Sequence, residues 1–165
     1  LWTVVGLALL LTYKSSGADD NIWPAVFGFT NPLIISLIAV VRKEERTKFS
    51  AIDWLCAVFC FISLALWLVV REEKDLARFA LYLAIVADAF AAIPTIVFVW
   101  KHPDGDRPFA WGMFAVGYVM GVFAISDHTF ANYILPVYMF VASFFIVLPL
   151  ALHRFRRQIP LSEWV

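Results

Sequence analysis

The stretch from Phe79 to Trp100 constrains the fold most, because its 22 residues contain one acid, one proline and no other charged side chain. At about 1.5 Å per residue, a helix of this length crosses a bilayer core of about 30 Å. Asp88 lies near its midpoint, and a carboxylate there costs on the order of 3 kcal/mol in insertion free energy. We therefore expect Asp88 to face protein or water, within a turn of the Phe90 carbonyl that Pro94 leaves without its usual amide donor.

The composition places the chain in a membrane. Hydrophobic residues make up 62% of its 165 residues, charged residues 16%, and the net charge is zero. A soluble domain of this size cannot bury so much apolar surface, so lipid must be part of its solvent. The apolar runs are continuous rather than alternating, which indicates helices and not a barrel. The sequence predicts one all-α domain over 1–165, a polytopic transmembrane helix bundle surrounded by lipid. Zero net charge gives no reason to expect a nucleic acid partner.

Charged residues separate six apolar segments. These are Leu1–Tyr13, Ile22–Val41, Ala51–Val70, Phe79–Trp100, Phe109–Ile125 and Ala131–Leu152. The first is too short to cross a bilayer alone, so we expect it to be truncated, with further residues before Leu1. At the start of the third segment, Ser50 and Asp53 have the spacing of a helix-capping pair. The short connections predict that segments adjacent in sequence are antiparallel neighbours.

Lysines and arginines are distributed unequally between the two ends of these segments. One side carries nine, namely Arg42, Lys43, Arg46, Lys48, Lys101, Arg107, Arg154, Arg156 and Arg157. The other side carries four, namely Lys14, Arg71, Lys74 and Arg78. Because basic loops stay inside, we expect the first side and the C-terminus to be cytoplasmic, in a multi-pass protein of a bacterial inner membrane.

The first two segments resemble the last two at an offset of 109 to 112 residues. The matched pairs are Trp2 and Trp111, Ser16 and Ser126, Asn21 and Asn132, Pro24 and Pro136, and Asn31 and Ser143. Such self-similarity predicts repeat-like halves at 1–41 and 79–152, with 51–70 as a linker helix. In this arrangement Phe79–Trp100 begins the second unit, and we expect its counterpart in the first unit to precede Leu1. A single linker helix then makes the two three-helix units parallel rather than inverted.

This plan resembles that of the SWEET and PQ-loop transporter class, whose halves are parallel repeats. More specifically, DAFAAIPTIVFVWKHPDGDRPFAWGMF (88–114) and YILPVYMFVAS (133–143) resemble an uncharacterised group of small bacterial multi-pass membrane proteins. Thr95 follows Pro94 where the PQ-loop pattern has glutamine, and Ser143 stands where a substrate-facing asparagine is expected.

Asp88 is the first candidate for chemistry. Apolar surroundings favour its protonated form, and a midplane carboxyl that exchanges a proton is what a proton-coupled carrier needs. The alternative is a protonated acid that bonds a neighbouring Asn, Ser or Tyr and only fixes helix packing.

Asn31 and Pro32 form a second candidate, because Pro32 frees the Gly28 carbonyl and transporters place sites at proline-interrupted helices. A kink relieved by Thr30 or by a packed neighbour is the alternative. Tyr138 and Ser143 are five residues apart, so we expect at most one of them to line the same cavity.

Gly117 and Gly121 have the spacing at which membrane helices approach closely, either within this chain or across a homodimer.

No nucleophile with a nearby base, glycine-rich phosphate loop or metal-spaced cluster is present, so we expect no enzyme activity, metal or cofactor. We therefore expect a transporter-like protein with a small-solute or proton site. The alternative function is a non-catalytic accessory or assembly subunit that packs against other membrane subunits.

Overall fold

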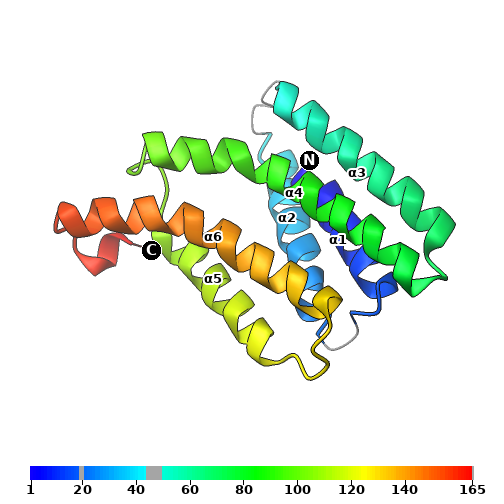
Figure 1. Cartoon of the computed structure of the whole chain (residues 1–165). Coiled ribbons are helices and arrows are strands. Elements are labelled where there is room, and N and C mark those ends of the chain that lie inside the picture. Colours follow the sequence, from blue (N-terminus) through cyan, green and yellow to red (C-terminus); the bar gives the residue numbers. More distant parts are fainter. Residues whose placement is uncertain (19–20, 44–49, 165) are drawn as a thin grey trace.

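The computed structural model describes residues 1–18, 21–43 and 50–164, and their secondary structure is helical throughout (Figure 1). The elements are α1 (Trp2–Ser15), α2 (Trp23–Val41), α3 (Ala51–Val70), α4 (Lys74–Lys101), α5 (Pro108–Phe123), α6 (Phe130–Arg156) and a short 3₁₀ helix at Leu161–Glu163. Helices α2, α3, α4 and α6 are long and apolar enough to cross a membrane. The expected all-α fold with six helices is confirmed for these residues, and the four long apolar helices indicate a multi-pass membrane protein.

The largest extensions beyond the apolar segments that the sequence delimits occur in α4 and α6. Helix α4 begins at Lys74 instead of Phe79, and α6 continues to Arg156 instead of ending at Leu152. In the added first turn of α4, Arg78 Nη1 donates to Asp75 Oδ1 at 2.8 Å. Charged residues mark where the lipid ends, but a helix continues into water when its charges pair locally or suit the helix dipole.

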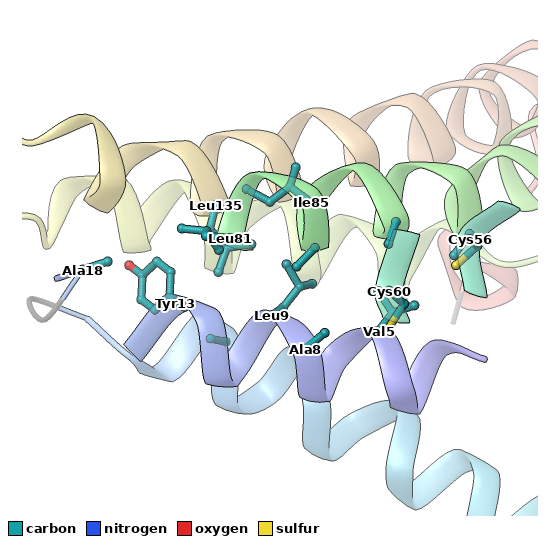
Figure 2. Packing of buried hydrophobic residues seen from close by; sticks show 14 of the residues in the cluster. Val5, Ala8, Leu9, Tyr13, Ala18, Cys56, Cys60, Leu81, Ile85 and Leu135 are labelled. Carbon is teal, nitrogen blue, oxygen red and sulfur yellow. The ribbon is translucent and has the colours of Figure 1, made fainter. Parts of the chain in front are cut away.

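Helix α4 is the centre of the bundle and packs against α3, α1 and α6 (Figure 1). Its buried face includes Ala77, Ala80, Leu81, Ala84, Ile85, Asp88, Ala91 and Ala92. The three- and four-residue spacing forms one stripe, and the alanines allow neighbouring helices to approach closely. Figure 2 shows Leu81 and Ile85 in the core with Leu9 of α1 and Leu135 of α6. Asp88 is therefore placed on the most enclosed face of the most central helix.

Glycine allows α1 and α2 to meet backbone to backbone. A Cβ on Gly6 would lie 2.5 Å from the Gly28 carbonyl oxygen and 2.8 Å from Phe29 Cα, distances that no side chain tolerates. The Gly28 carbonyl is the one that Pro32 leaves without a helical donor. Helix α2 nevertheless continues through Pro32, and Thr30 Oγ1 donates to the Val26 carbonyl at 3.0 Å. The helix is therefore not interrupted at Pro32, and α1 packs closely against the freed Gly28 carbonyl.

Polar contacts tie each end of the bundle. At the end that holds the α1–α2 connection, Trp67 Nε1 donates to Ser15 Oγ at 2.8 Å. At the opposite end, the buried Arg154 donates to the Pro103 carbonyl at 3.1 Å and to the Asp106 carbonyl at 2.8 Å. The α4–α5 connection is thus fixed to the end of α6.

The predicted topology counts nine cations on this side of the bundle. Two of them, Arg46 and Lys48, lie outside the described residues.

Candidate functional site

A carboxyl–hydroxyl pair joins α4 to α6 inside the bundle. The Tyr138 hydroxyl donates to Asp88 Oδ2 at 2.7 Å, and Asp88 is only 4% exposed. Within the described chain, Tyr138 is the one hydrogen-bond partner of this carboxyl. Asp88 faces protein rather than lipid, as its central position in an apolar helix predicts. The bond can form only because α6 packs on the buried face of α4, which brings together residues 50 positions apart.

Asp88 borders a cavity of about 280 Å³ to which five helices contribute. The lining residues are Trp2, Phe27, Gly28, Asn31, Pro32, Ile35, Ser36, Asp88, Trp111, Phe114, Tyr118, Met139 and Ser143. Among the residues singled out from the sequence, Asn31, Pro32 and Ser143 thus share one space with Asp88. Of the pair five residues apart on α6, Ser143 lines the cavity, and Tyr138 reaches it only through the Asp88 carboxyl.

Pro94 does not join this group. It lies on an exposed face of α4 and is not among the residues that line the cavity. Six residues at about 100° each place it roughly 240° around the helix from Asp88. Phe90, whose carbonyl Pro94 frees, stacks on Phe59 of α3 with ring centroids 5.3 Å apart. The freed carbonyl therefore lies within a turn of Asp88 along the axis but not on its face.

Aromatic rings form much of the cavity wall, and sequence reasoning did not assign them to the site. Trp111, Phe114 and Tyr118 follow one another at three- and four-residue spacing on α5, so they share a face. Trp2 lies across from α5 on α1, and Trp2 and Trp111 are one of the matched pairs of the proposed repeat. Helical spacing and the repeat were thus the available signals. Both are equally typical of a lipid-facing aromatic stripe, so neither identifies a cavity wall without coordinates.

A larger groove of about 670 Å³ runs between α2 and α5 and shares lining residues such as Asn31 and Tyr118 with the cavity. The two predicted packing glycines differ here. A Cβ on Gly121 would lie 3.5 Å from Pro24 Cγ and 3.9 Å from Pro136 Cβ, so α2, α5 and α6 converge at this point. Gly117 borders the groove, and nothing lies within 4 Å of its Cβ position. Only one end of the α2–α5 pair is therefore closed within this chain.

In chemical terms, the cavity offers a carboxyl, an amide and hydroxyls within aromatic and aliphatic walls. Asn31 supplies both a donor and an acceptor, and Ser143 supplies a hydroxyl that serves as either. Such a site can hold a small solute by a few hydrogen bonds or exchange a proton at the acid.

Throughout residues 1–18, 21–43 and 50–164, no group of three His, Cys, Asp or Glu side chains is placed to hold a metal ion. Comparison with protein-family models, curated proteins and solved structures finds no match for this chain.

Proposed function

We propose that this protein is a transporter of a bacterial inner membrane that carries a small solute or a proton through the cavity at Asp88. The observation that carries the proposal is the convergence of Asp88, Asn31 and Ser143 on one 280 Å³ cavity, with Tyr138 bonded to the Asp88 carboxyl. These groups come from three helices, and burying them inside a bundle has a cost unless they are used or paired. A purely packing role for Asp88 requires its hydrogen bond but does not require open space beside it.

Each group has a separate role in this proposal. Asp88 is the exchangeable acid, and Tyr138 holds its carboxyl in one orientation. Asn31 and Ser143 hydrogen-bond the solute from opposite walls, while Trp2 and Trp111 limit its size. Parallel three-helix repeats like those of the SWEET and PQ-loop class would put the site between the two halves, where Trp2 and Trp111 face the same space.

The proposed orientation places the C-terminal end of α6 in the cytoplasm. It rests on the excess of lysine and arginine on that side of the predicted topology. The buried Arg154 belongs to the same end, where it holds the α4–α5 connection. Cysteines added to the α3–α4 turn would then react with an impermeant thiol reagent only from the periplasmic side.

Reconstitution in liposomes tests the transport proposal. The parent protein and Asp88→Asn are compared for uptake of radiolabelled glucose, sucrose and small amino acids, with a trapped pH-sensitive dye reporting proton movement. Asp104→Asn is the matched control, because Asp104 is exposed in the α4–α5 connection. We expect Asp88→Asn to reduce transport at least about tenfold, the loss that follows from one charge-assisted interaction. Unchanged transport in Asp88→Asn would remove the acid from the mechanism.

One observation favours the second candidate function, an accessory or assembly subunit. Helix α2 is apolar, yet Ala25 is its only buried residue, and the groove beside it is open. A foreign transmembrane helix would find an apolar face there. A photo-crosslinker at Phe27, which lines this groove and is 51% exposed, would then give one discrete protein adduct in native membranes. Crosslinks to lipid alone, together with solute uptake by the parent, would exclude the accessory role.

A further inference from the structure

A second polar site lies at the end of α6, separate from the Asp88 cavity and independent of the proposed transport. It is a pocket of about 340 Å³ between the ends of α4 and α6 and the connection after α4. The lining residues are Trp100, Pro103, Pro149, Leu152, His153, Arg156 and Arg157. The described lining thus combines two arginines and a histidine with an apolar floor and contains no acid.

Helical spacing explains why the cations gather on one side. Arg156 follows Leu152 by four residues and His153 by three, so the three share a face of α6, and Arg157 follows His153 by four. Arg154 differs from its neighbours, because it is buried and donates to two carbonyls of the α4–α5 connection. It is not among the residues that line the pocket, and its guanidinium group is engaged with the connection after α4.

The two arginines of the lining have no counter-charge among residues 1–18, 21–43 and 50–164. Neither Arg156 nor Arg157 forms an ion pair or side-chain hydrogen bond with any described residue, and both are exposed. The nearby Asp106 is already engaged, since its carboxyl accepts from Trp111 Nε1 at 2.9 Å and from the Arg107 amide at 2.7 Å. Two unpaired guanidinium groups beside one pocket therefore favour an anionic ligand.

The position of the pocket, at the end of the apolar run of α6, indicates which kind of anion it would bind. The apolar run of α6 ends at Leu152. Trp100 lies in the last turn of α4, and its Nε1 donates to the Phe145 carbonyl at 3.0 Å. Tryptophan at a helix end is typical of the boundary between acyl chains and headgroups. Along α6, Pro149 and Leu152 fall within the apolar run, and the arginines follow after it.

We propose that this pocket binds one anionic phospholipid. Arg156 and Arg157 hydrogen-bond its phosphate, and an acyl chain lies along Trp100, Pro149 and Leu152. A guanidinium group matches phosphate oxygens in a bidentate geometry, and basic pockets between membrane helices recognise such headgroups. A soluble phosphate would meet the same arginines but gain nothing from the apolar floor.

Native mass spectrometry of the detergent-solubilised full chain tests the proposal. The parent, R156Q/R157Q and R42Q/K43Q are titrated with phosphatidylglycerol or with phosphatidylcholine of the same acyl chains. The R42Q/K43Q control removes the same charge on the same predicted side, from exposed residues outside the pocket. A third variant, R156K/R157K, keeps the charge but loses the planar fork. Circular dichroism verifies that every variant keeps its helix content.

We expect the parent to retain one phosphatidylglycerol in preference to phosphatidylcholine. R156Q/R157Q should weaken that binding at least about tenfold, whereas R42Q/K43Q should stay within about twofold of the parent. R156K/R157K should fall between them. Equal weakening in both glutamine variants, or no preference for the anionic lipid, would overturn the proposal. Displacement of the lipid by inorganic phosphate at millimolar concentration would also overturn it, because the site would then take a soluble anion.

Discussion

The hydrogen bond between Tyr138 and Asp88 gives the sharpest prediction for stability. Tyr138→Phe removes only the hydroxyl, which donates to Asp88 Oδ2 at 2.7 Å. The ring remains, so the packing of α6 against α4 is preserved. Since no other described group bonds to the Asp88 carboxyl, the variant leaves a buried acid without a partner.

The magnitude follows from the burial and the length of this bond. A net hydrogen bond contributes about 0.5–1.5 kcal/mol between neutral groups and about 1.5–3 kcal/mol when one group is charged. Measured values between membrane helices average about 0.6 kcal/mol and reach about 1.7 kcal/mol. A short bond to a carboxyl that is 4% exposed belongs near the upper end of that range. We therefore expect Tyr138→Phe to lower the free energy of unfolding by about 1–2 kcal/mol.

A double-mutant cycle with Asp88→Ala separates the bond from the volume change. Unfolding is followed by circular dichroism as sodium dodecyl sulfate is added to detergent micelles. Tyr82→Phe is the matched control, because the Tyr82 ring packs against Phe79 and Phe130 while its hydroxyl has no hydrogen-bond partner among the described residues. We expect a coupling energy of about 1 kcal/mol between Tyr138 and Asp88. A coupling energy within about 0.3 kcal/mol of zero, or equal losses in the two Tyr→Phe variants, would refute the argument.

Two further predictions concern the contacts that hold the bundle together. Gly6→Val should separate α1 from α2 and lower the free energy of unfolding by about 1–3 kcal/mol, whereas Gly117→Ala should be nearly neutral because its Cβ position is open. The same detergent titration measures both, and equal effects would contradict the backbone contact. Arg154→Met should release the α4–α5 connection, seen as faster amide hydrogen exchange around Pro103, because it removes donors to two carbonyls. Unchanged exchange there would show that Arg154 does not hold the connection.

Local features of the fold were predictable from the sequence. The Ser50–Asp53 spacing predicts a helix cap, and the structure has both hydrogen bonds of a capping box at the start of α3. The bounds of α3 agree with the predicted segment, whereas α4 starts five residues earlier than its apolar run. Capping depends on neighbours within one turn, which sequence spacing fixes. Helix extension beyond the lipid is not visible in hydropathy, so charged residues were a poor guide to the start of α4.

The candidate site was predictable only in part. Asp88, Asn31 and Ser143 are polar residues in apolar helices, and their cost in lipid is reason enough to place them inside the bundle. Pro94 was selected by its distance from Asp88 along the chain, but its angle around α4 puts it on another face. The aromatic wall on α5 was missed because apolar residues give the same hydropathy whether they face lipid or a cavity.

The sequence by itself determined that this is an all-α chain with membrane-length apolar helices and an acid enclosed among them. Continuous apolar runs and the cost of a charge in hydrocarbon are sufficient for that conclusion. Only the tertiary structure decided that Tyr138 meets Asp88, that Gly6 meets Gly28, and that α2 stays open toward α5. The physical reason is that lipid tails and leucine side chains are equally apolar, so hydrophobic patterning cannot tell which helix faces which neighbour. That choice is made by close packing and a few hydrogen bonds, which appear only when the helices are assembled.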